Sequence, residues 1–391
     1  MVPEGWQVQR LGAIASFRNG LNFLKDSGGE QVRVVGIPHF WQRQTMTSFD
    51  DIELSFVGRL SHDDYLRSGD LLFVRSNGNK DLIGRCMYFP KVETPLSFSG
   101  FTIRGRVNET VIKPQYASAL MQTRIVKDQI SRGGGGTNIS NLSQAILSSI
   151  VVPLPPLPEQ TKIVEILSTW DAAIETTGKL LASAVAQKQA LMQQLLTGQR
   201  RYAEFQKDSW GQFTVEDVAE CLDRKRVPLN EGERRAMPGL IPYWGANGIV
   251  DYVSDFIFDE PLVLLAEDGG YFDEYATRPI ANLSLGKCWV NNHAHVLRAR
   301  PNCKTEWLFF SLVHKDITAF TNSGTRSKLN QADMRKIPLW LPSLAEQEAI
   351  VETLAVAAKS VERLALKAQL LASERSALMQ QLLTGKRRVT A

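Results

Sequence analysis

Residues 190–198 read Ala-Leu-Met-Gln-Gln-Leu-Leu-Thr-Gly, and residues 377–385 read the same, 187 positions later. Upstream at the same displacement, Leu157-Pro-Glu-Gln160 corresponds to Leu344-Ala-Glu-Gln347. This register holds without a gap from about residue 154 to residue 201 of the first copy, and chance does not produce that. An internal repeat therefore organises the chain.

The remaining sequence repeats more loosely. The spacing of Trp6 and Ile14-Ala15 is echoed by Trp210 and Val218-Ala219, and Arg104-Gly-Arg106 is echoed by Arg298-Ala-Arg300. We therefore divide the chain into four segments, in which variable and constant sequence alternate. The predicted segments are 1–150 (variable), 151–201 (constant), 202–338 (variable) and 339–391 (constant).

Each constant segment is predicted to be one long helix. Prolines precede it, and Gly198 or Gly385 stands where a helix ends on a left-handed residue. Between these signals apolar residues recur with the alternating spacing of four and three that is typical of a coiled coil. The two helices either bury these stripes against each other, which we favour, or pack separately on their own domains. The predicted seam consists of Ile163, Leu167, Trp170, Ile174, Leu181, Leu191 and Leu195 in the first helix and Ile350, Leu354, Val361, Leu364, Leu371, Leu378 and Leu382 in the second.

Several polar residues of these helices are repeated unchanged, while the middles of the helices have diverged. Packing along a seam does not require this, because only two positions of each heptad face the seam. Recent duplication is one explanation, but it should also have left the middles alike. We therefore predict that each copy docks a common partner. The predicted docking residues are Glu159, Gln160, Gln193 and Gln194 with their copies Glu346, Gln347, Gln380 and Gln381.

Composition excludes several classes of protein. The 391 residues are 43% hydrophobic and 22% charged, which is typical of a globular protein. The N-terminus has no signal-peptide pattern and no apolar run is long enough for a membrane helix, so we expect a cytoplasmic protein without membrane partners. Four scattered cysteines do not make a disulfide framework. The net charge of +4 permits nucleic acid as a partner without requiring it.

The variable segments carry no recognisable catalytic motif. We find no phosphate-binding Gly-x-x-x-x-Gly-Lys-Ser/Thr loop, no Gly-x-Ser-x-Gly elbow and no methyltransferase motif in the sequence. The cluster Cys288, His293, His295 and Cys303 matches no standard zinc spacing, so we predict hydrogen-bonded or DNA-facing side chains there and no metal site. We predict no catalytic residue and no cofactor in this chain.

The variable segments instead combine short strand-like runs, among them Phe98–Ile103, with polar and basic turns that contain aromatics. Arg, Asn and Gln side chains read base edges, and Lys, Ser and Thr suit phosphates. An ordinary solvated loop is the alternative for any one of them, but the recurrence in both copies favours DNA contact. The predicted DNA-binding residues are Trp41, Arg43, Arg75, Asn77, Lys80, Arg104, Arg106, Thr137 and Asn138 in the first segment, and Tyr243, Trp244, Asn247, Asn292, His293, Arg298, Arg300, Arg326 and Lys328 in the second.

The recurring arginine pairs invite a more specific hypothesis. A residue that both domains retain is better suited to phosphate, which all DNA shares, than to one base. We therefore assign Arg104, Arg106, Arg298 and Arg300 to phosphate contacts. An ion pair at a strand end is the alternative.

The alternating order, the Leu-x-Glu-Gln that opens each helix and the stretch Ile241–Gly248 together resemble the specificity subunit of type I restriction–modification systems. The resemblance covers the whole chain. It implies two α/β (α+β) target-recognition domains, each reading one half of a bipartite double-stranded DNA target. It also implies an antiparallel coiled coil that spaces the domains and docks two modification (methyltransferase) subunits. S-adenosylmethionine, ATP and magnesium are then expected on the modification subunits and on the restriction/translocase subunits.

Two alternatives stay open at this point. One is a DNA-modifying enzyme with a site that we do not recognise, which would transfer methyl groups without partners. The other is a coiled-coil adaptor with no DNA readout, which would add no sequence preference to a partner's DNA binding.

Overall fold

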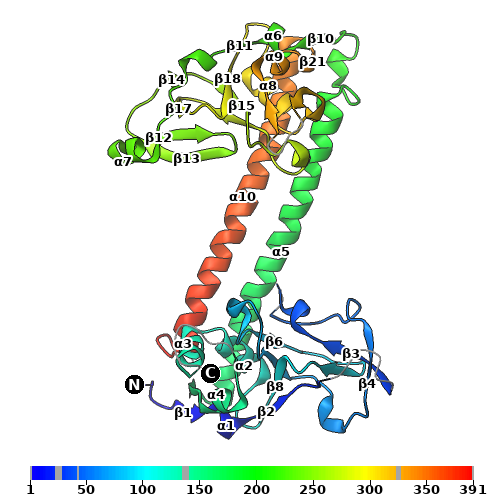
Figure 1. Cartoon of the computed structure of the whole chain (residues 1–391), viewed down its shortest axis with the longest axis vertical. Coiled ribbons are helices and arrows are strands. Elements are labelled where there is room, and N and C mark those ends of the chain that lie inside the picture. Colours follow the sequence, from blue (N-terminus) through cyan, green and yellow to red (C-terminus); the bar gives the residue numbers. More distant parts are fainter. Residues whose placement is uncertain (1, 23–28, 42–43, 134–140, 323–326, 390–391) are drawn as a thin grey trace. The chain divides into compact units, whose positions relative to one another are not determined.

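The computed structural model describes residues 2–22, 29–41, 44–133, 141–322 and 327–389 (Figure 1). Its contacts divide the chain into two compact units, residues 1–178 with 366–391 and residues 179–365. Each unit therefore contains one variable segment and parts of both constant segments, and the four segment boundaries stay a prediction. No helix in the described ranges is long and apolar enough to cross a membrane.

The first unit is built on an antiparallel sheet with the order β2-β8-β5-β6. A smaller sheet, β4-β3-β7, contains one parallel pair, β3 with β7, and β1 pairs with β9. The strands are β1 (Gln7–Arg10), β2 (Ala15–Asn19), β3 (Glu30–Val35), β4 (Leu54–Val57), β5 (Leu71–Val74), β6 (Cys86–Tyr88), β7 (Leu96–Phe98), β8 (Thr102–Val107) and β9 (Val151–Leu154). The short helices are α1 (Leu11–Ile14), α2 (Pro114–Met121), α3 (Arg124–Gly133) and α4 (Gln144–Ser149).

The second unit repeats this plan. Its main antiparallel sheet has the order β11-β18-β15-β16, its second sheet contains the parallel pair β12 and β17, and β10 pairs with β21. The strands are β10 (Gly211–Thr214), β11 (Ala219–Cys221), β12 (Pro238–Gly245), β13 (Gly248–Val253), β14 (Phe258–Asp259), β15 (Leu262–Ala266), β16 (Ala281–Ser284), β17 (Lys287–Val290), β18 (Ala294–Ala299), β19 (Thr321–Asn322), β20 (Lys328–Leu329) and β21 (Pro338–Leu341). The short helices are α6 (Val215–Val218), α7 (Glu231–Ala236), α8 (Thr305–Leu312) and α9 (Gln331–Met334).

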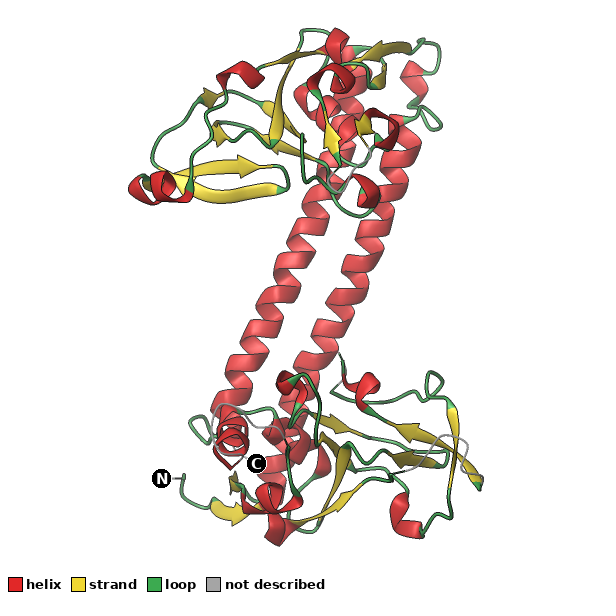
Figure 2. Ribbon diagram, viewed as in Figure 1, coloured by secondary structure: helices red, strands yellow, loops and turns green. Residues whose placement is uncertain are grey.

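The constant segments form α5 (Leu157–Leu196) and α10 (Leu344–Leu383), each a helix of 40 residues (Figure 2). In the first unit Ile163, near the start of α5, shares a core with Leu382, near the end of α10. In the second unit Leu195, near the end of α5, shares a core with Ile350, near the start of α10. In each unit both helices therefore contribute to one core, so separate packing of each helix on its own domain is wrong. Every predicted seam position is buried or half-buried.

The ends of both long helices follow the predicted cap. Gly198 and Gly385 have φ of 71° and 73°, the left-handed conformation in which glycine carries no steric penalty. Two residues beyond each glycine the chain turns back, and the Arg200 N–H donates to the Gln194 carbonyl at 3.0 Å. Its copy Arg387 donates to Gln381 at 3.1 Å. These bonds satisfy carbonyls that a helix end otherwise leaves unpaired.

One predicted strand is interrupted. The run Phe98–Ile103 reads as continuous β sequence, but β7 ends at Phe98 and β8 begins at Thr102. Thr102 N–H and its Oγ1 both donate to the Ser99 carbonyl, which closes a turn. A Cβ on Gly100 would lie 1.9 Å from Asn22 Oδ1, so any other residue here would displace the Asn22 side chain. The turn exposes Phe101.

Candidate nucleic-acid interface

A buried glutamate joins each variable segment to its long helix. In the first unit the Trp6 indole N–H donates to Glu159 Oε2 at 3.0 Å, and Arg388 forms a two-pronged ion pair with the same carboxylate at 2.8 and 2.9 Å. Burial alone would raise the pKa of Glu159, but the hydrogen bonds from Arg388 and Trp6 outweigh burial and hold that pKa below its usual value. We call these three residues the first clasp.

The second unit contains the same arrangement. Trp210 donates to Glu346 Oε2 at 3.0 Å, and Arg201 pairs with both oxygens of Glu346 at 2.8 and 2.7 Å. In both units the arginine also lies over the tryptophan ring, 5.7 Å from its centroid. We call this set the second clasp. Both glutamates are predicted docking residues, but in the structure they hold a tryptophan and an arginine of their own unit.

The neighbouring glutamines are also internal. Gln160 accepts from the Lys113 N–H at 2.8 Å and donates to two carbonyls, and Gln347 does the same with the Lys304 N–H at 2.9 Å. Glu159 and Glu346 are 4% and 0% exposed, and both glutamines are fully buried. The docking prediction is therefore wrong for these four residues. Their repetition serves the packing of each domain on its helix.

The other repeated glutamines lie near the ends of α5 and α10, on the surface. Gln193, Gln194 and Gln381 are exposed, and Gln380 is half-buried. Their backbone carbonyls accept hydrogen bonds at the helix ends, but their side chains form no hydrogen bond with another described residue. Partner docking stays a prediction for these four residues.

The strand pairing corrects the arginine alignment. Arg106 faces Ser16 across β2 and β8, and Arg298 faces Glu220 at the matching place across β11 and β18. Arg106 and Arg298 are therefore the true counterparts, and the position equivalent to Arg104 is occupied by Val296. Aligning the two Arg-x-Arg patterns shifts the two strands by two residues relative to each other. A shift of two residues along a strand keeps each side chain on the same face of the sheet.

The shared arginine is an ion-pair residue. Arg106 holds Asp70 with two bonds of 2.7 Å, and Arg298 holds Glu260 in the same two-pronged manner. Asp70 is 1% exposed, so Arg106 balances a buried charge. The ion-pair alternative therefore describes Arg106 and Arg298 better than phosphate contact does.

Phosphate contact is wrong for Arg104 and is not tested for Arg300. The Arg104 side chain is 5% exposed and donates to the Asp63 carbonyl at 2.7 Å, so it is not available to DNA. Arg300 is exposed and donates to the Glu216 carbonyl at 3.2 Å.

Three chain segments meet at one end of each main sheet. In the first unit the Arg75 N–H donates to the Phe101 carbonyl at 2.8 Å, and the Leu142 N–H donates to the Arg75 carbonyl at 2.7 Å. We call this meeting point the first junction. Arg75 directly follows the last residue of β5, and Phe101 directly precedes the first residue of β8. The Arg75 side chain also donates to the Gly100 carbonyl at 3.3 Å, which holds it against the exposed turn.

The second unit has the same junction with different side chains. The Glu267 N–H donates to the His293 carbonyl at 2.9 Å, and the Leu329 N–H donates to the Glu267 carbonyl at 2.7 Å. Beside this second junction lies a hollow of about 470 Å³, lined in part by Asn247, Asp268 and Asn291. His293 lines it as well. The structure thus brings His293 and Asn247 together, as expected of one binding surface.

Other predicted DNA-binding residues are distributed over both units. Trp41 is 63% exposed, and Lys80 and Asn292 are exposed, whereas Asn77 is half-buried. Lys328 is exposed beside the second junction and pairs with Glu267 at 3.3 Å. For these residues DNA contact stays a prediction.

Tyr243 and Trp244 behave differently from the rest. Tyr243 is 1% exposed and its hydroxyl accepts from the Leu229 N–H at 2.9 Å, so its assignment to DNA is wrong. Trp244 is half-buried, packs against a core cluster, and its indole nitrogen has no hydrogen-bond partner within the described ranges. The predicted residues Arg43, Thr137, Asn138 and Arg326 lie outside the described residues.

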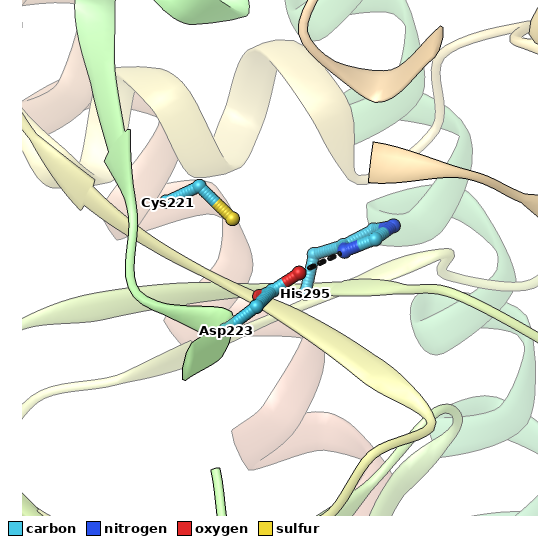
Figure 3. Close-up of side chains that lie close together, drawn as sticks. All are labelled: Cys221, Asp223 and His295. Carbon is cyan, nitrogen blue, oxygen red and sulfur yellow. Dashed lines mark hydrogen bonds and ion pairs between the residues drawn. The ribbon is translucent and has the colours of Figure 1, made fainter. Parts of the chain in front are cut away.

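Cys221, Asp223 and His295 form the one metal-like cluster within the described part of the chain (Figure 3). His295 Nδ1 lies 2.6 Å from Asp223, and Nε2 lies 2.9 Å from the Leu329 carbonyl. Both ring nitrogens therefore face oxygen acceptors, and burial raises the pKa of the Cys221 thiol. A metal needs a thiolate and a free imidazole lone pair, so this donor set does not fit one.

The cluster instead holds one of the segments of the second junction in place. His295 lies on β18 and binds Leu329, one of the three segments that meet there. Cys288, His293, His295 and Cys303, which lie near one another in the sequence, do not form one cluster, because Cys288 and Cys303 belong to separate cores and His293 pairs with Asp268.

The two units repeat one α+β plan, each with an equivalent junction and parts of both long helices, and they define an internally duplicated protein. The family model described as "Type I restriction modification DNA specificity domain" matches residues 3–184 and 207–372. The chain therefore belongs to this family, carries the domain twice, and is a DNA sequence-specificity subunit.

Similar proteins agree with this assignment. A putative type I restriction enzyme specificity subunit of Haemophilus influenzae is 33% identical over 141 residues, 36% of this chain and 35% of that protein. A putative type I restriction enzyme specificity subunit of Methanocaldococcus jannaschii is 24% identical over 99% of this chain and 95% of its own length. The crystal structure of the S subunit from M. genitalium shares the fold, with a TM-score of 0.63 at 13% identity over 98% of this chain and 97% of that one.

Proposed function

We propose that each variable segment reads one half of a bipartite double-stranded DNA target. The observation that carries this proposal is the pair of junctions, which share backbone hydrogen bonds but present different side chains. A common scaffold with different surface chemistry is what two readers of different bases require. The ion-paired Arg106 and Arg298 belong to the scaffold.

We further propose that α5 and α10 act as an antiparallel coiled coil that sets the distance between the two half-sites and docks two modification subunits. Exposed Gln193 and Gln194, with their copies Gln380 and Gln381, supply one docking surface for each subunit. The two docking surfaces are alike because the helix ends are repeated almost unchanged.

In this proposal the chain performs no chemistry of its own. Methyl transfer from S-adenosylmethionine belongs to the modification subunits. ATP- and magnesium-dependent translocation and cleavage belong to the restriction/translocase subunits of the full complex. The proposal places no catalytic residue in either variable segment.

The test is methylation mapping of DNA from cells that contain the chain with its modification subunits. A bipartite target with a fixed unread gap supports the proposal. Methyl transfer by the purified chain without those subunits would favour the enzyme alternative, and partner DNA binding that does not change when the chain is added would favour the adaptor.

A further inference from the structure

The two junctions share one equivalent side-chain position. Thr102 pairs with the last residue of β5 and Ala294 with the last residue of β15, so Thr102 is equivalent to Ala294 and Phe101 to His293. Independent evidence comes from the matching bonds Arg75 N–H to Phe101 carbonyl and Glu267 N–H to His293 carbonyl. The sequence alignment had missed this equivalence because it placed the strands two residues out of register.

Both side chains are exposed, and their chemistry differs. Phe101 is 61% exposed, at the turn between β7 and β8. The His293 side chain is 41% exposed and lines the hollow beside the second junction. An equivalent backbone thus presents an apolar ring in one unit and a hydrogen-bonding ring in the other.

Asp268 orients His293. Its Oδ1 lies 2.5 Å from His293 Nδ1, and an ionised carboxylate only accepts, so Nδ1 carries the hydrogen. In the neutral ring Nε2 then presents a lone pair, and it has no partner among the described residues. Such a lone pair accepts from the exocyclic amino group of adenine or cytosine in the major groove.

The acidic residues at the second junction have partners, so we do not expect them to repel DNA. Glu267 is paired with Arg226 at 2.6 Å and with Lys328 at 3.3 Å. Asp268 is engaged with His293. The carboxylates near His293 therefore have cationic or hydrogen-donating partners.

We propose that Phe101 and His293 are matched specificity residues, one in each domain. Phe101 contacts a thymine methyl group in its half-site, and His293 accepts a hydrogen bond from an adenine or cytosine amino group in the other half-site. Asp268 is the positioning residue that fixes the ring of His293. This inference rests on the proposed function, because it assumes that each domain reads one half-site.

The experiment compares the methylated target of the wild-type complex with those of single variants, each expressed with the same modification subunits. Phe101→Ala should relax one thymine position in one half-site, with a loss of discrimination of roughly fourfold, about one methyl group's transfer energy. His293→Ala should relax one adenine or cytosine position in the other half-site by roughly tenfold. Each variant is the control for the other half-site.

Further variants separate a specific role from general damage. Phe56 is another exposed phenylalanine of the first unit, at 43%, and Phe56→Ala should leave the target unchanged. Asp268→Ala should reproduce the relaxation of His293→Ala, whereas Asp268→Asn keeps an oxygen that accepts from Nδ1 and should retain the wild-type target.

Size-exclusion chromatography of each complex distinguishes the outcomes. An unchanged target for Phe101→Ala and His293→Ala in intact complexes overturns the inference. Loss of the modification subunits from a folded variant also overturns it, because these residues would then dock protein. A wild-type target without two half-sites would contradict the proposed function itself, and the inference would fall with it.

Discussion

At the scale of single residues, most of the repeated charged side chains serve the fold. Glu159, Glu346, Arg106 and Arg298 each pair within their own unit. Repetition was therefore a good guide to shared structure and a poor guide to the residues that contact DNA. Side chains at equivalent positions that differ, such as Phe101 and His293, are the better candidates for base reading.

Replacing Arg106 with Ala should lower stability more than replacing Arg298. The first change leaves Asp70, which is 1% exposed, without its counter-charge and should cost about 3 kcal/mol. The second leaves Glu260, whose side chain is 30% exposed, where water can replace the pair, and should cost about 1 kcal/mol. Urea unfolding measures both. Equal costs would contradict the burial argument, and a reduced salt dependence of DNA binding without lost stability would restore the phosphate assignment.

Acid should weaken the first clasp. The pKa of Glu159 lies below its unfolded value, so its stabilising contribution is complete above the unfolded pKa and is lost as pH falls through the folded pKa. Glu159→Gln removes this contribution, so the variant should be less stable than wild type at pH 7, and the difference should shrink as the pH falls below the unfolded pKa of about 4.3 and through the lower folded pKa. Urea midpoints at several pH values test this. A constant difference across the range would contradict the assignment.

At the scale of elements, the long helices could be predicted from the periodicity of the sequence. The side-chain contacts between distant parts of the sequence could not. The heptad spacing and the glycines predicted α5, α10 and their caps, because those signals are local. The buried contacts of Gln160 with Lys113 and of Glu159 with Arg388 join residues far apart in sequence, so no local signal separated them from surface docking. The turn at Phe101 was missed because its flanking residues all favour strands, although Gly100 gave a signal for it.

Docking should be separable for the two ends of the coiled coil. Changing Gln193 and Gln194 together to Lys adds two charges to one proposed docking surface and should reduce the number of bound modification subunits from two to one. Gln187→Lys is the control, because Gln187 is exposed on the same helix but its copy is Glu374. Native mass spectrometry counts the subunits. Two subunits bound to the double variant would exclude these glutamines from docking.

At the scale of the whole molecule, we expect the two helices to set the distance between the sites that the two recognition domains read. Each helix has 40 residues, about 60 Å at 1.5 Å per residue. One heptad inserted into both helices, near Thr177 and Leu364, preserves the seam and adds about 10 Å. The half-sites should stay the same, and the unread gap should lengthen by roughly one to three base pairs. Methylation sequencing of an active variant with an unchanged gap would show that the docked subunits set the distance.

The most direct test of the account is an exchange of one recognition domain. Residues 11–149 would be replaced by the matching segment of another family member, with Trp6, β1 and β9 retained so that the first clasp and the β1–β9 pairing persist. Methylation mapping of the hybrid complex then gives its target. The account predicts that one half-site changes completely while the other keeps every base. A change in both half-sites, or in neither, would contradict it.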